Sequence, residues 1–150
     1  MNGWMDITRP IFAGMPVWPG DPPIDVQRLS SVEDGAISNV SRWHLGTHTG
    51  THVDPPRHFV ARAATVLEMP LDSLCGEAFV VDARGIRPHV STRDLEAVVP
   101  SGVRRVLLQT DNSLADENVF HEDFVALTND AADWLVSRGV LAIGVDGPSI

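Results

Sequence analysis

The chain has 150 residues, of which 43% are hydrophobic, and its formal net charge is −9. This length and composition indicate one domain with a real core and exclude a largely disordered chain. An acidic surface repels phosphate backbones and anionic lipids, so we expect neither nucleic acid nor a membrane as partner. All eleven basic residues are arginines, which excludes chemistry that requires a lysine Schiff base or P-loop lysine.

The N-terminal part of the chain opens with a proline-rich loop. Residues 15–23 contain four prolines, which remove backbone donors and are incompatible with a helix. This loop carries Trp18, for which two interpretations stay open: an aromatic wall for a planar substrate, or a hydrophobic lid packed on a sheet. Residues 24–32 and 37–45 then alternate as strands do, and the turn signal at Glu33-Asp34-Gly35 predicts a hairpin between them.

From residue 71 onward the pattern is regular α/β. The capping-box sequence from Ser91 to Asp94 predicts a helix that ends before Pro100, and Thr128 caps a second helix that ends at Gly139. Apolar runs separate these helices and predict parallel pairing. The expected strands are 77–82, 104–110 and 140–145. The predicted fold class is therefore α/β.

Cysteine usage and hydropathy limit the location of the protein. The single cysteine, Cys75, excludes an internal disulfide, and its place before an apolar run predicts a buried, inert thiol. No apolar run approaches the roughly 18 residues of a membrane span. The first eight residues contain no basic cluster of the kind that begins a signal peptide. We therefore expect a cytoplasmic protein.

The segment that carries chemistry is HTGTHVDPPRH at residues 48–58. It holds three of the chain's six histidines together with Asp54. Imidazole and carboxylate ligands together suit zinc, manganese or iron. If the segment is extended, His48, His52 and Asp54 point to one side, with Gly50 leaving room between them. We therefore predict a divalent metal held by these three side chains.

The other histidines divide by their neighbours. Pro55-Pro56 should bend the chain sharply and bring His58 back over the metal, where it would serve as proton shuttle. His44, His89 and His121 lie outside this segment and are expected to be structural. Three ligands with an open position are typical of a catalytic metal, and these parts suit amide, ester or lactone hydrolysis. No GxSxG motif is present, which disfavours a serine hydrolase.

The same segment resembles a known family. HTGTHVDPPRH is similar to the HxGTHxDxPxH signature of the cyclase-type metal hydrolases, best known from bacterial kynurenine formamidase (arylformamidase). Three further segments resemble parts of that family in the correct order. They are the Trp18 loop at residues 17–23, MPLDSL at 69–74, and GVDGPS at 144–149.

The resemblance implies a swivelling β/β/α domain with a mixed sheet, flanking helices and a two-metal site that usually holds zinc. His48, His52 and Asp54 would bind the metals, with Asp54 reaching both, His58 would transfer protons, and Trp18 would contact the substrate. The implied reaction is the hydrolysis of N-formylkynurenine, a small aromatic amide, to kynurenine and formate in tryptophan catabolism. Two alternatives remain: a relative that acts on another cyclic amide, lactone or isatin-like substrate, and a metal-binding remnant without activity.

The end of the chain carries one more expectation. Family chains continue past the Asp-x-Pro-Ser loop and supply a further histidine and a glutamate to the metals, whereas this sequence ends at Ile150. We therefore expect residues 1–150 to form a single domain that lacks its C-terminal part. Exposed strand edges invite association, so we also expect a homodimer or higher oligomer.

Overall fold

The computed structural model describes residue 3 and residues 5–150. Contacts between residues divide it into two compact units: unit 1 comprises Met1–Arg62 with Glu117–Phe120, and unit 2 comprises Ala63–Asp116 with His121–Ile150. The single-domain expectation stays a prediction. Among the described residues, none of the helices is long and apolar enough to span a bilayer.

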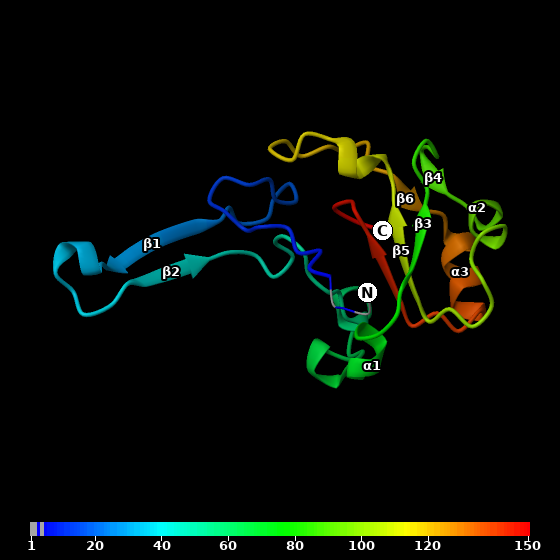
Figure 1. Ribbon diagram of the computed structural model, residues 1–150, viewed down its shortest axis with the longest axis horizontal. Coiled ribbons are helices and arrows are strands. Elements are labelled where there is room, and N and C mark those ends of the chain that lie inside the picture. Colours follow the sequence, from blue (N-terminus) through cyan, green and yellow to red (C-terminus); the bar gives the residue numbers. More distant parts are fainter. Residues whose placement is uncertain (1–2, 4) are drawn as a thin grey trace. The chain divides into compact units, whose positions relative to one another are not determined.

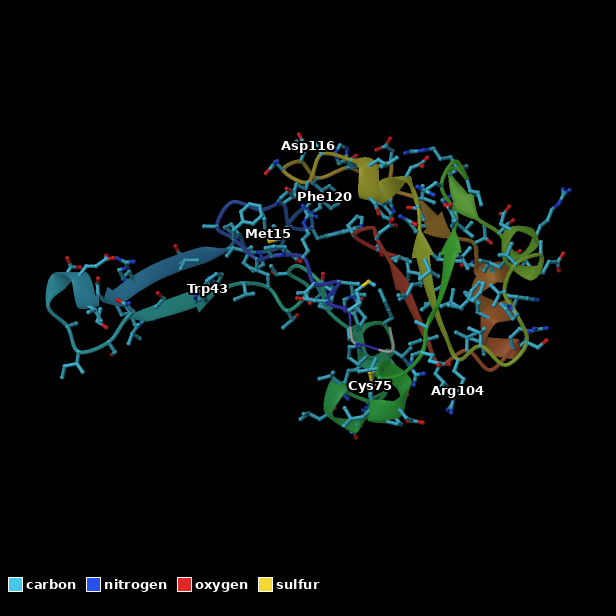
Figure 2. All side chains as sticks on the ribbon, viewed as in Figure 1. Met15, Trp43, Cys75, Arg104, Asp116 and Phe120 are labelled. Carbon is cyan, nitrogen blue, oxygen red and sulfur yellow. The ribbon has the colours of Figure 1, made fainter. Side chains whose placement is uncertain are left out.

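Unit 1 contains the predicted hairpin (Figure 1). Strands β1 (Asp25–Ser30) and β2 (Val40–His44) pair antiparallel. The connection contains the 3-10 helix η1 (Val32–Asp34) and Gly35, whose φ of +89° lies in the left-handed region that glycine adopts without steric cost. Trp43 on β2, labelled in Figure 2, is half exposed. The hairpin prediction is confirmed, with strands shorter than expected at both ends.

Unit 2 contains a three-stranded parallel sheet in the order β3-β5-β7. These strands are β3 (Phe79–Asp82), β5 (Arg105–Gln109) and β7 (Ala142–Val145). All three lie inside predicted strands, and the predicted parallel pairing is confirmed. The structure adds two short parallel strands that the sequence did not indicate, β4 (His89–Val90) and β6 (Ala126–Leu127).

The two longer helices begin at the capping residues that the sequence predicts. Helix α2 (Thr92–Glu96) begins with the predicted capping box of Ser91 and Asp94. Helix α3 (Asn129–Ser137) begins at Thr128, whose side chain accepts a hydrogen bond from the Ala131 amide, and Gly139 follows its end with a φ of +77°. The single turn α1 (Leu71–Leu74) precedes β3.

Helices α2 and α3 lie on the same side of the sheet (Figure 1). Alternate residues of β5, Val106 and Leu108, are buried with Val81 of β3, as the two-residue period of a strand requires. Leu95 of α2 and Leu135 of α3 complete this core. The apolar faces of these strands and helices are thus buried against one another in a single layer.

The carboxyl ends of β5 and β7 are tied together by Asp146. Its carboxylate accepts hydrogen bonds from the Thr110 amide at 2.7 Å and the Thr110 hydroxyl at 2.8 Å, and another from the Ser113 hydroxyl. Thr110 is only 1% exposed. The Asp146 carboxylate at this strand end is therefore used to join the two strands.

One sequence expectation on unit 2 is wrong. Cys75, labelled in Figure 2, is exposed rather than buried. The cause is local: α1 ends at Leu74 with Cys75 as its C-cap, and the following strand begins only at Phe79. The thiol therefore lies between two elements instead of inside either one.

Candidate metal centre

Three of the predicted ligand atoms converge in unit 1. His48 Nδ1 lies 2.8 Å from Asp54 Oδ1, and His52 Nε2 lies 3.3 Å from the same oxygen. His48 Nδ1 and His52 Nε2 are 3.2 Å apart. The three atoms therefore form a nearly equilateral triangle, which the structure builds from residues close together in the sequence.

The backbone that forms this triangle is a turn rather than the expected extended strand. Strand β2 ends at His44, and the Thr49 amide donates to the Gly46 carbonyl. Gly50 has a φ of +66°, and a Cβ added there would come within 2.9 Å of Ile11 Cγ1. The left-handed glycine reverses the chain, so convergence of the ligands arises from a bend instead of strand alternation. We name residues 46–58 the metal loop.

The orientation of His52 is fixed by its own loop. Its Nδ1 lies 2.8 Å from the Gly50 carbonyl oxygen, which can only accept a hydrogen bond. Nδ1 must therefore carry the proton, and in the neutral ring the lone pair of Nε2 points away from Gly50. Histidine ligands of metals almost always donate their second ring N–H to a carboxylate, a backbone carbonyl or water.

This geometry fits a divalent cation. Nε2 of neutral His52 and Oδ1 of Asp54 both offer lone pairs across their 3.3 Å separation, an arrangement that a proton or a cation between them must stabilise. Ligands bound to zinc at roughly 2.0–2.2 Å in a tetrahedron are about 3.3 Å apart. The three observed separations, 2.8, 3.2 and 3.3 Å, are close to this value. The donor set thus suits a divalent cation such as zinc or manganese.

His58 is brought back to the same place, as predicted. The two prolines lead into the 3-10 helix η2 (Pro56–His58), and the His58 amide donates to the Pro55 carbonyl at 2.9 Å. The His58 ring then lies against that of His48, with centroids 3.9 Å apart and planes tilted by 34°. Ligand-type atoms of His48, Asp54 and His58 all lie within 4.8 Å of one another. His58 is therefore close enough to exchange protons beside a bound ion.

Trp18 has a partner that the sequence did not reveal. Its ring meets that of Phe120 edge to face, with centroids 5.4 Å apart and an interplanar angle of 83°. Phe120 belongs to unit 1 although the rest of that unit ends at Arg62. No local spacing relates residue 120 to residue 18, so only the folded chain shows the pair. Trp18 is still 46% exposed, which leaves part of its surface accessible.

The three remaining histidines lie in structural settings. His44 ends β2 opposite Asp25 in the hairpin register. His89 lies in β4, and His121 Nε2 is 3.1 Å from the Asp116 carbonyl oxygen. Among the residues that the structure describes, only the metal loop groups histidine with carboxylate as a cation site.

Known proteins with a similar sequence or structure belong to one class. The sequence profile of a family described as "Putative cyclase" matches residues 5–150. A solved structure described as a "potential metal-dependent hydrolase with cyclase activity" is similar with a TM-score of 0.80 and 30% identity, over 96% of this chain and 67% of that one. A "predicted metal-dependent hydrolase from Bacillus stearothermophilus" has a TM-score of 0.78 and 29% identity, over 96% and 68%.

The chain therefore belongs to the cyclase family. The family resemblance drawn from HTGTHVDPPRH is confirmed at this level, and so is the predicted α/β fold class.

Proposed function

We propose that the protein is a metal-dependent hydrolase that converts N-formylkynurenine to kynurenine and formate, a step of tryptophan catabolism. The observation that carries the metal-dependent part is the triangle of His48 Nδ1, His52 Nε2 and Asp54 Oδ1. Family membership and the two metal-dependent hydrolases of similar structure support the same class of reaction. The proposal takes zinc as the metal.

The residues of the metal loop divide the chemistry between them. His48, His52 and Asp54 would hold the ion, which when bound supplies Lewis acidity at a carbonyl and acidifies a water molecule. His58 would accept a proton as water attacks the formyl carbon, and would return it to the amine nitrogen as the C–N bond breaks. Its ring is kept near the ligands by the stack on His48. One water molecule thus adds across the C–N bond, which gives formate and the free amine.

The choice of an aromatic amide rests on Trp18 and Phe120. Their edge-to-face arrangement holds the indole of Trp18 in one orientation while leaving it half exposed. An exposed indole face suits a planar aryl group, because aromatic rings attract one another beyond their buried area. N-formylkynurenine offers both a formamide and an aryl ring.

A second candidate is a ring-opening hydrolase. One similar structure is described as having cyclase activity, and the same metal, proton shuttle and aromatic wall would serve a cyclic amide, a lactone or an isatin-like substrate. The two candidates share the metal loop and differ only in substrate.

The test is hydrolysis by purified protein loaded with zinc, with manganese in a parallel sample. N-formylkynurenine and isatin are supplied separately, and the products are separated by liquid chromatography. Formation of kynurenine and formate, lost on chelation, is the expected result. Opening of isatin alone would favour the second candidate, and metal binding without turnover of either would indicate a non-catalytic remnant. His44→Ala is the matched control, because His44 is exposed in the same unit but outside the cluster.

A further inference from the structure

Arg9 makes contacts with two segments that are far from it in the sequence. Its backbone amide donates to the hydroxyl oxygen of Thr51 at 2.9 Å. Its guanidinium Nη2 donates to the carbonyl oxygen of Glu117 and lies 4.0 Å from the Glu117 carboxylate. All three residues belong to unit 1. One residue therefore links the metal loop to the segment Glu117–Phe120.

Thr51 occupies a sensitive place in the metal loop. It stands between Gly50, whose carbonyl orients His52, and His52 itself. The backbone of Thr51 therefore joins the Gly50 carbonyl, which is the acceptor, to His52, whose ring donates to it. A tether on the Thr51 side chain restrains the direction in which His52 Nε2 points.

The metal loop needs such restraint because it contains little regular structure. Apart from the three residues of η2, it has neither helix nor strand, and its ligands are only partly covered by protein. Metal ligands must be held within about 0.5 Å of their productive positions by surrounding contacts. The side chain of Arg9 is 40% exposed, whereas its Nε is buried and has no hydrogen-bond partner among the described residues.

The segment Glu117–Phe120 is a suitable anchor. Besides the carbonyl that receives Arg9, it carries Phe120, which contacts Trp18. The same short segment therefore contacts both the residue that reaches the metal loop and the residue proposed to contact substrate.

We propose that Arg9 is a positioning residue of the metal centre, which it stabilises by tying Thr51 of the metal loop to Glu117. This inference rests on the proposed metal-dependent function. It predicts that loosening either end of the tether weakens metal binding, although neither Arg9 nor Thr51 contacts the metal.

The experiment measures affinity for Co²⁺ by competition with a chromophoric chelator, together with the visible absorption spectrum of the bound Co²⁺. Arg9→Met removes the guanidinium and keeps the stem, while Thr51→Val removes the hydroxyl and keeps the shape. We expect each to weaken binding by about 10-fold, the lower end for residues that support metal ligands, and to broaden the Co²⁺ spectrum. The double variant should be little worse than either single variant, because both break one tether.

Two variants serve as controls. Thr51→Ser keeps the acceptor oxygen and should retain native affinity. Arg42→Met removes an exposed arginine of β2 whose guanidinium contact, to Gln27, lies within the hairpin, and it should also bind as the native chain does. Circular dichroism checks that each variant is folded.

The outcomes separate the two proposals. A native chain that binds no Co²⁺ would refute the metal-dependent function itself. Native binding with unchanged affinity and spectrum in Arg9→Met would refute the role of Arg9 alone. If Arg9→Met fails to fold, the role of Arg9 is tested with Thr51→Val and Arg9→Lys instead. Weaker Co²⁺ binding by Thr51→Val together with native binding by Arg9→Lys would support the tether. Any other combination of results would overturn it.

Discussion

The imidazole of His58 stacks on that of His48, with ring centroids 3.9 Å apart. The stack places His58 beside a predicted ligand, while His48, His52 and Asp54 bring three donor atoms into a close triangle. His58 is thus held near the proposed metal ligands by the His48 ring, as the proposed role of proton shuttle would require.

Replacing His58 should therefore separate catalysis from binding. We expect His58→Ala to keep its metal and to lose turnover by about 10²- to 10⁴-fold, the usual contribution of a general acid–base group. Elemental analysis and initial rates measure the two effects, with His44→Ala as the matched variant. A folded His58→Ala chain that has lost its metal would make His58 a ligand instead.

The opposite result is expected for the ligand triangle. The double variant His48→Ala, His52→Ala leaves only Asp54 of the three donors and should abolish metal binding, a larger loss than the about 10- to 100-fold of an outer residue. Elemental analysis of the purified variant gives the occupancy. Full occupancy would show that the metal is bound elsewhere in the chain.

Gly50 allows a comparison with a second glycine. Gly50→Ala meets two obstacles, a φ of +66° and Ile11 Cγ1 at 2.9 Å, whereas Gly35→Ala meets only a φ of +89° with open space around it. Left-handed backbone costs roughly 1–2 kcal/mol for other residues, so both should destabilise. We expect only Gly50→Ala also to weaken Co²⁺ binding.

The contact with Ile11 can be tested in the same background. Adding Ile11→Ala to Gly50→Ala removes the atoms that the new Cβ meets, and we expect it to restore part of the lost affinity. Equal Co²⁺ affinity in Gly50→Ala and Gly35→Ala would show that Ile11 does not constrain the metal loop.

Asp146 should matter for stability. Asp146→Ala would leave the amide and hydroxyl of Thr110, a residue only 1% exposed, without their acceptor. An unsatisfied buried donor costs about 1–3 kcal/mol, so we expect a clear fall in the urea midpoint of unfolding. Asp133→Ala removes an exposed aspartate of α3 and is the control. Identical midpoints for the two variants would contradict this role.

The capping box of α2 should contribute stability that depends on pH. Hydrogen bonds from the Ser91 hydroxyl and amide lower the pKa of Asp94 below its ordinary value. A carboxylate with a lowered folded pKa stabilises the fold above its unfolded pKa, about 3.9, and loses this effect as pH falls below it. Ser91→Ala should cost about 1 kcal/mol near neutral pH, and the difference from the native chain should shrink at about pH 3. A difference that is the same at both pH values would speak against the box.

The elements that sequence predicted well are those encoded locally. The hairpin, the box at Ser91, the cap at Thr128 and the glycine after α3 depend on a few neighbouring residues, and the structure contains each of them. The convergence of His48, His52 and Asp54 can be predicted for the same reason, because the three residues belong to one segment.

The features that sequence missed depend on distant contacts or on backbone detail. β4 and β6 have only two residues each, too few to show a period. The pairing of Trp18 with Phe120 and of Arg9 with Glu117 joins residues that no spacing relates. An extended metal loop is compatible with the sequence, but the left-handed Gly50 makes it turn.

The closeness of the ligands along the chain has a thermodynamic consequence. An ion held by His48, His52 and Asp54 closes only a very short loop, and the entropy removed from the unfolded chain by such a cross-link is small. The same three side chains remain neighbours after unfolding, so the unfolded chain keeps some affinity for the ion. Binding to the unfolded state subtracts from the stabilisation that a ligand gives by mass action. A tightly bound ion should therefore raise the melting temperature less than its dissociation constant for the folded protein implies.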